Sequence, residues 1–74
     1  YPAISITASR RGIHILSNDG SPLESVRIYD LQGRILLDEQ PAGSAYLYPV
    51  SKPGVYIVRV ENRKVSETKK LSIR

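Results

Sequence analysis

The chain has 74 residues, 41% of them hydrophobic, and a formal net charge of +4 at pH 7. This length predicts one globular domain with a small core. The sequence contains no Cys, which excludes disulfides, thiolate catalysis and cysteine metal sites. Because it starts with Tyr1 and shows no signal segment, we expect residues 1–74 to form a single domain at the C-terminal end of a longer protein.

The positive charge is concentrated near the end of the chain. Five basic and five acidic residues balance each other up to position 58, whereas positions 59–74 hold six basic residues and two acidic ones. The plainer interpretation of this pattern is solvated charge on an outer sheet face. The alternative is contact with an anionic partner.

The first two strands are predicted from short alternating runs at residues 3–8 and 12–16. The apolar positions expected to face the core are Ile4, Ile6, Ala8, Ile13 and Ile15. His14 alternates with them and is expected to point outward. Residues 9–12 are short enough for either a hairpin turn or a bulge within one strand, and the pattern leaves both open.

A loop and a β-hairpin follow. Residues 18–22, with the sequence NDGSP, form the strongest loop signal in the chain. Two partner strands are then predicted, over residues 25–30 and 34–38. The connection at residues 30–33 fits a four-residue hairpin turn with Gly33 at the position of positive φ.

The second half of the chain contains the most distinctive run, residues 53–60, with the sequence PGVYIVRV. A turn pair followed by β-branched and aromatic residues predicts a strand at the centre of a sheet, and we expect both of its faces to be buried. Before it, residues 45–48 predict a strand on which Tyr46 and Tyr48 share a face.

The closing strand is predicted over residues 65–73. Alternation places Thr68, Lys70 and Ser72 on one face. The opposite face receives Lys69, Leu71 and Ile73. The apolar residues stay in phase along the whole run, so no bulge is required.

The chain is therefore predicted to be all-β. No segment shows a helical period, and about seven short strands separated by turn signals indicate a sandwich or a barrel. An immunoglobulin-like β-sandwich of about seven antiparallel strands fits best, without the Cys pair and core Trp of that fold.

The residues that carry chemistry do not form a recognisable catalytic, cofactor or metal site. His14 is the only histidine, and the adjacent Asp38 and Glu39 point to opposite faces of a strand. Neither Tyr46 nor Tyr48 belongs to an aromatic pattern of nucleic-acid recognition, and we expect both to cover a sheet face. We therefore expect no enzyme activity, no cofactor and no nucleic-acid partner.

Three blocks of the sequence together resemble a known family. They are VRIYDLQGR at residues 26–34, PGVYIVRV at residues 53–60 and TKKLSI at residues 68–73. In this order they are similar to the C-terminal sorting domain of type IX secretion (the Por secretion system sorting domain). The resemblance spans residues 25–74. The start of the chain departs from the family pattern, because Tyr1 and Pro2 alone match its usual opening.

The resemblance implies a non-enzymatic secretion signal. Such domains are immunoglobulin-like sandwiches at the end of cargo proteins of certain Gram-negative bacteria. The cargo passes through the periplasm, and an outer-membrane translocon recognises the domain and directs the cargo to the cell surface or the medium. A sortase-like peptidase typically removes the domain. The implied partners are therefore the translocon, the peptidase and an upstream cargo domain of the same chain.

Two groups of residues are singled out as candidates. The closing strand presents polar and basic side chains that a partner can read by charge or by edge pairing. The residues expected to be recognised by the translocon are Thr68, Lys69, Lys70, Ser72 and Arg74. The residues expected to carry the family motif and support the fold are Gly33, Pro53, Gly54 and Tyr56.

Two other functions remain open from the sequence. The first is an immunoglobulin-like binding or adhesion module for carbohydrate or protein, with Tyr46 and Tyr48 as its platform. The second is a terminal domain that only stabilises its neighbour. An exposed edge strand also leaves self-association of the chain open.

Overall fold

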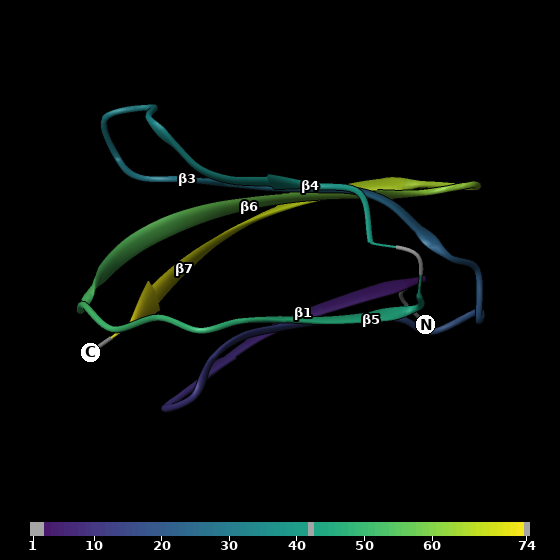
Figure 1. Cartoon of the computed structure of the whole chain (residues 1–74), viewed down its shortest axis with the longest axis horizontal. Coiled ribbons are helices and arrows are strands. Elements are labelled where there is room, and N and C mark those ends of the chain that lie inside the picture. Colours follow the sequence, from purple (N-terminus) through teal and green to yellow (C-terminus); the bar gives the residue numbers. More distant parts are fainter. Residues whose placement is uncertain (1–2, 42, 74) are drawn as a thin grey trace.

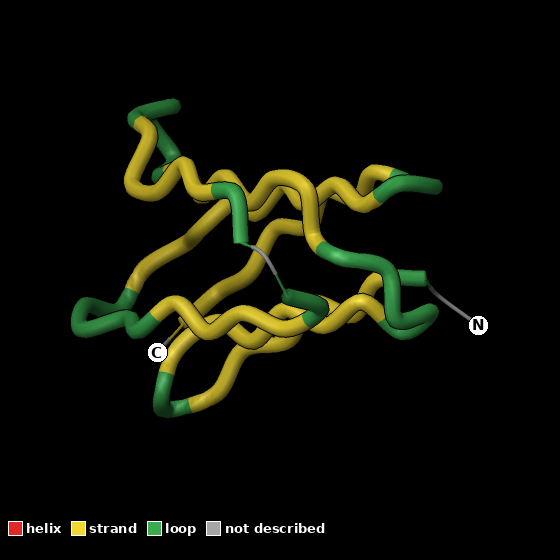
Figure 2. Tube along the Cα trace, turned by 45° about the vertical axis from the view of Figure 1, so that its right-hand side comes forward, coloured by secondary structure: helices red, strands yellow, loops and turns green. Residues whose placement is uncertain are grey.

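The computed structural model describes residues 3–41 and 43–73, and every regular element in these ranges is a β-strand. The strands are β1 (Ile4–Ser9), β2 (Gly12–Ser17), β3 (Leu23–Tyr29), β4 (Ile35–Glu39), β5 (Ala45–Tyr48), β6 (Gly54–Asn62) and β7 (Ser66–Ile73). They form two sheets, with the orders β1-β2-β5 and β4-β3-β6-β7. The sheets lie face to face in two layers (Figures 1 and 2). The predicted all-β sandwich is confirmed.

All strand pairs of the two sheets are antiparallel. The short link at residues 9–12 is a hairpin turn, because β1 and β2 pair along their whole length with Ile6 opposite Ile15. The predicted hairpin of β3 and β4 is also present. Its ladder contains a bulge, in which Leu36 is the extra residue between the partners of Ile28 and Tyr29.

The core is a layer of aliphatic side chains contributed by both sheets. Its buried members are Ile4, Ile6, Ile13, Ile15, Leu23, Val26, Ile28, Val58, Val60 and Leu71. The alternation of apolar residues predicted most of these positions. Ala8 was expected among them but is exposed, as are its neighbours Thr7 and Ser9 at the end of β1.

Strand β6 is an inner strand, between β3 and β7, but the prediction that both of its faces are buried is wrong. Val58 and Val60 face the core and are 0% exposed. On the other face, Val55 and Ile57 are partly exposed and Arg59 is exposed. A continuous apolar run is typical of two-sided burial, but in this sandwich each sheet has one covered face.

Gly12 sets how closely β2 approaches the segment that follows β5. Its φ is +137°, a conformation that L side chains rarely adopt. A Cβ atom at this position would collide with the carbonyl oxygen of Tyr48 and lie 2.9 Å from the Cα of Pro49. The sequence pattern did not single out this glycine, because the contact arises between strands that are distant in the chain.

We expect Gly12→Ala to lower the free energy of unfolding by about 3 kcal/mol, since it adds a backbone collision to an unfavourable φ. Gly20→Ala is the matched control. Gly20 also has a positive φ, of 79°, but no atom lies within 4 Å of its Cβ position, so backbone strain alone should cost about 1 kcal/mol. Chemical denaturation of both variants measures the difference. Equal losses would contradict the proposed close approach.

Candidate functional site

The closing strand β7 forms one edge of the four-stranded sheet and pairs with β6 alone. The pairing runs without a register shift from Gly54 opposite Ile73 to Glu61 opposite Ser66. The prediction that the closing strand needs no bulge is therefore confirmed. The strand also belongs to the core, because Leu71 is only 8% exposed.

The predicted recognition residues of β7 divide between its two faces. Thr68, Lys70 and Ser72 are exposed on the outer face of the sheet, opposite the face that buries Leu71. Lys69 points the other way, and its Nζ donates a hydrogen bond of 3.0 Å to the carbonyl oxygen of Ile6 in β1. Arg74 lies outside the described residues. The predicted alternation, which placed Lys69 and Lys70 on opposite faces of the strand, is confirmed.

The backbone of β7 also presents a free edge. The amide of Asn62 donates to the carbonyl oxygen of Val65 at 3.0 Å, which makes this pair the hydrogen-bonded end of the ladder. Hydrogen-bonded and non-hydrogen-bonded pairs alternate along antiparallel strands. The N–H and C=O groups of Thr68, Lys70 and Ser72 therefore point away from β6. The residues with outward side chains are also those with unpaired backbone groups.

Cations from neighbouring strands share the outer face with this edge. Arg59 stands opposite Thr68 and also opposite Arg27 of β3. The guanidinium groups of Arg27 and Arg59 form ion pairs of 3.5 Å with Asp38 and Glu61 respectively. Arg27 and Arg59 are thus partly neutralised. Among the described residues, no salt bridge includes Lys70.

The pKa of Arg27 is raised, first by its hydrogen bond with Tyr29 and then by the charge of Asp38. These two contacts therefore favour the charged form of the Arg27 guanidinium. The Tyr29 contact and the ion pair with Asp38 both engage this guanidinium within the sheet.

A buried polar bridge holds the β6–β7 turn against the smaller sheet. Asn62 and Ser17 are 5% and 3% exposed, and the Nδ2 of Asn62 donates to the Oγ of Ser17 at 3.3 Å. The Oδ1 of Asn62 accepts hydrogen bonds of 2.9 Å from the amides of Lys64 and Val65. The Ser17 hydroxyl donates onward to Asp19 at 2.9 Å. The bridge fixes where β7 begins.

The family block at the β3–β4 hairpin owes its shape to one carboxylate. The Oδ1 of Asp30 accepts hydrogen bonds of 2.9 Å from the amides of Gln32 and Arg34, and its Oδ2 accepts one of 2.8 Å from the Nε of Arg34. Gly33 has a φ of 84°, as predicted for this turn. The contribution of Asp30 and Arg34 was missed, although Asp before a Gly-containing turn is a recognisable Asx signal.

These contacts also lower the pKa of Asp30, chiefly through the backbone hydrogen bond from Arg34. Asp19 has a lowered pKa for the same kind of reason, with the amide of Ser21 as its main donor. Residues 18–20 thus form a turn stabilised by a carboxylate.

The start of β6 explains the other motif residues. Gly54, which follows Pro53, has a φ of 156°. The hydroxyl group of Tyr56 donates a hydrogen bond of 2.7 Å to the carbonyl oxygen of Lys52, while its ring packs against the core. Tyr56 therefore packs against the core and also ties its hydroxyl group to the turn that precedes β6.

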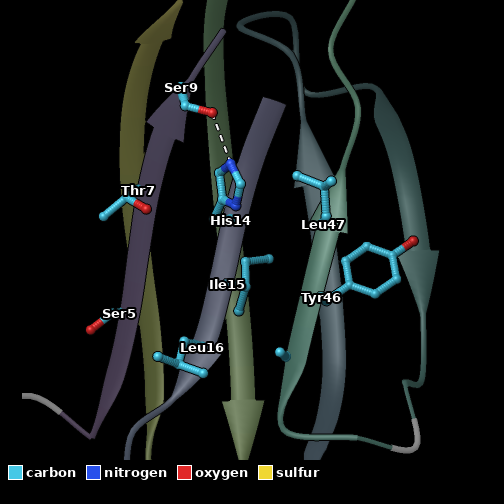
Figure 3. A pocket seen from close by; sticks show the side chains of 9 residues that line it. Ser5, Thr7, Ser9, His14, Ile15, Leu16, Tyr46 and Leu47 are labelled. Atoms are coloured by element: carbon cyan, nitrogen blue, oxygen red, sulfur yellow. Dashed lines mark hydrogen bonds between the residues drawn. The ribbon is translucent and has the colours of Figure 1, made fainter. Parts of the chain in front are cut away.

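A shallow groove of about 770 Å³ lies on the outer face of the smaller sheet (Figure 3). Hydroxyl side chains of β1, together with His14, Leu16 and Leu47, line it. Ser9 Oγ and His14 Nε2 are 2.8 Å apart, but no carboxylate lines the groove to orient the imidazole for nucleophilic catalysis.

Tyr46 and Tyr48 do share a face of β5, as predicted, but that face packs against the core and both side chains are partly buried. They therefore form no exposed platform for a carbohydrate. Within residues 3–41 and 43–73, no group of three or more His, Asp or Glu side chains is placed to hold a metal ion. The same ranges contain no helix of the length and hydrophobicity required to cross a membrane.

The comparison with protein families identifies the chain. The model of the family described as "Secretion system C-terminal sorting domain" matches residues 9–74. The match covers most of the chain, which therefore belongs to this family, the C-terminal sorting domains of type IX secretion. Membership implies export across the outer membrane, to the cell surface or into the medium. A search of curated proteins found no match.

We expect Asn62→Ala to lower the free energy of unfolding by about 1–3 kcal/mol, because it leaves two backbone amides without their acceptor and removes the hydrogen bond that the buried Ser17 Oγ accepts. Arg63→Ala, at an exposed position in the same turn, should change it by less than about 0.5 kcal/mol. Urea denaturation measures both values. A loss of similar size in the two variants would contradict the role of the bridge.

The hydrogen bonds to Asp30 should be lost in acid. Because its pKa is lowered on folding, the carboxylate stabilises the folded chain above the unfolded pKa of about 3.9, and this stabilisation disappears as the pH falls through the lower folded value. NMR titration should therefore show the Gln32 and Arg34 amides shifting below pH about 4. In Asp30→Asn these shifts should be absent. Titration of Asp30 at or above its unfolded pKa would contradict the expectation.

Proposed function

We propose that this domain is a non-enzymatic signal that the type IX translocon recognises at the closing strand. The single observation that supports this proposal is the arrangement of β7 at a sheet edge. Thr68, Lys70 and Ser72 combine outward side chains with unpaired backbone groups, so both side-chain charge and strand pairing are accessible to a partner.

The proposed contact residues are the five predicted from the sequence, with different tasks. Thr68, Lys70 and Ser72 offer the outer stripe, and Lys70 is its cation. Arg74 would add a further positive charge after this stripe. Lys69 acts through its hydrogen bond to β1, which positions β7, so it supports recognition without offering its ammonium group to the outer face. Gly33, Pro53, Gly54 and Tyr56 maintain the turns and the core.

In this proposal the domain follows a cargo domain of the same chain. The cargo crosses the periplasm, the outer-membrane translocon binds the domain, and a sortase-like peptidase removes it at the cell surface. The edge position of β7 supports such a sequence of events, because an edge strand is available to a partner while the rest of the sandwich stays folded. The partial burial of Tyr46 and Tyr48 against the core supports this proposal over a binding module that uses them as its platform.

The test is export of a reporter protein fused to this chain in a bacterium that has the type IX system. Lys70→Glu should retain most of the reporter in the periplasm, because it reverses the charge of the outer stripe. Arg63→Glu makes the same change of charge in the exposed β6–β7 turn and should leave export intact. The mass of the exported reporter shows whether the domain has been removed.

Point substitutions test recognition at this stripe more specifically than truncation of the closing strand does. Deleting residues 69–74 would also remove Leu71 from the core, so loss of export could result from unfolding. Circular dichroism of the purified domain should show that Lys70→Glu remains folded. Equal export of the Lys70→Glu and Arg63→Glu fusions would refute recognition at this stripe.

A further inference from the structure

The fold divides the charged residues of the chain between the two ends of the sandwich. One end, at the left of Figure 1, holds the β1–β2 turn, the β3–β4 turn, the β5–β6 connection and the end of β7. The other end holds the β2–β3 connection and the β6–β7 turn (Figures 1 and 2). Each end collects segments that are far apart in the sequence, so the linear charge pattern does not reveal this division.

The first of these ends is basic. Arg10 and Arg11 form the β1–β2 turn, Lys52 lies in the β5–β6 connection, and all three are exposed. Among the described residues, none of the three takes part in a salt bridge. The acidic residue at this end, Asp30, is paired with Arg34 at 2.8 Å. The other six acidic residues of the chain lie toward the opposite end, and they are Asp19, Glu24, Asp38, Glu39, Glu61 and Glu67.

Contacts between the connections join the free cations into one surface. Arg10 borders a hollow of about 200 Å³ together with the last residues of β7. Gly12, which follows Arg11, lies against the start of the β5–β6 connection. On that connection, Lys52 borders a second hollow, of about 170 Å³, together with Leu36 of β4. The β1–β2 turn, the β5–β6 connection and the start of β4 are therefore neighbours at this end.

An apolar side chain lies at the same end. Leu31 occupies the β3–β4 turn and is 62% exposed, the highest value among the large hydrophobic side chains of the described residues. Asp30 accepts hydrogen bonds from the amides of Gln32 and Arg34, so the turn keeps its shape although Leu31 is not buried. Apolar side chains accompanied by Lys and Arg are typical of segments that bind at the interface of an anionic membrane.

We propose that this surface, the basic end, docks the domain onto an anionic lipid membrane. It consists of Arg10, Arg11 and Lys52, which contact phosphate headgroups, and of Leu31, which inserts between them. The inference goes beyond recognition at β7, because the basic end is formed by the connections between strands and not by the outer face that carries Lys70.

The arrangement of the cations favours a lipid surface over a single phosphate ion or an acidic peptide. Arg10 and Lys52 lie on separate connections, and the hollows beside them are separate and small. An acidic peptide would need a groove that joins them, whereas a layer of headgroups offers phosphate to each cation independently. The acidic residues at the opposite end are repelled by the same surface, so the charge distribution also orients the sandwich on the membrane.

The test is co-sedimentation of the purified chain with vesicles of equal parts phosphatidylglycerol and phosphatidylcholine. We expect binding to these vesicles but not to vesicles of phosphatidylcholine alone, and we expect it to weaken as the salt concentration rises. In bicelles of the same mixture, a paramagnetic lipid should broaden the NMR signals of the amides at residues 10–12, 31–33 and 50–52. The amides at residues 62–65 should keep their intensity.

Two pairs of adjacent basic residues provide matched variants. The double substitution Arg10→Gln and Arg11→Gln should weaken vesicle binding about thirtyfold, because it removes two cations from the basic end. Arg63→Gln with Lys64→Gln removes the same charge from the β6–β7 turn at the opposite end and should weaken it by less than about threefold. Leu31→Ser should weaken it about tenfold, since the inserted apolar side chain is lost.

Three results would overturn the proposal. The first is equal binding of the two double variants, with NMR spectra that show both to be folded. The second is equal binding of the unaltered chain to the mixed vesicles and to phosphatidylcholine alone. The third is binding of soluble polyglutamate as tight as that of the mixed vesicles, which would assign the surface to an acidic protein partner.

Discussion

The contact between one covered face of a three-stranded sheet and one covered face of a four-stranded sheet governs this structure. The buried side chains that join the two layers are almost all Ile, Val or Leu, and the chain is too short to build a second layer on either outer face. A strand with one covered face therefore turns alternate side chains toward the core and the others toward solvent. Strand β4 is the exception, because four of its five residues are exposed.

This arrangement makes the closing strand both structural and accessible. Leu71 belongs to the core, and the Asn62–Ser17 bridge fixes the turn from which β7 starts. The outer face of the same strand remains open, with Thr68, Lys70 and Ser72 in line. In the proposed function, this combination would let a partner read β7 while the sandwich stays folded.

The motifs of the family have separate physical meanings in this chain. The hairpin block is shaped by Asp30, whose carboxylate gathers the turn amides and the guanidinium of Arg34. The block at β6 supplies the inner strand of the larger sheet, and Tyr56 ties its start to Lys52. The final block forms β7, an edge strand of the larger sheet. Two blocks therefore build the scaffold, and the third occupies the position where a partner has access.

Local sequence patterns determined the class of fold and most of the core. Alternation at period two identified Ile4, Ile6, Ile13 and Ile15 as inward residues of β1 and β2, because a strand with one covered face leaves that signature in the chain itself. Turn chemistry located Gly33 for the same local reason. These features depend on a few consecutive residues, and so the sequence alone was sufficient for them.

Only the tertiary structure decided what lies on each face and beyond each edge. The apolar run of β6 predicted two buried faces, but coverage depends on a second layer that a single segment does not reveal. Gly12 meets Tyr48, Asn62 meets Ser17 and Lys69 meets Ile6 across distances of many residues in the chain. Alternation already placed Lys69 and Lys70 on opposite faces, but only the fold brings the Lys69 ammonium to the Ile6 carbonyl of β1.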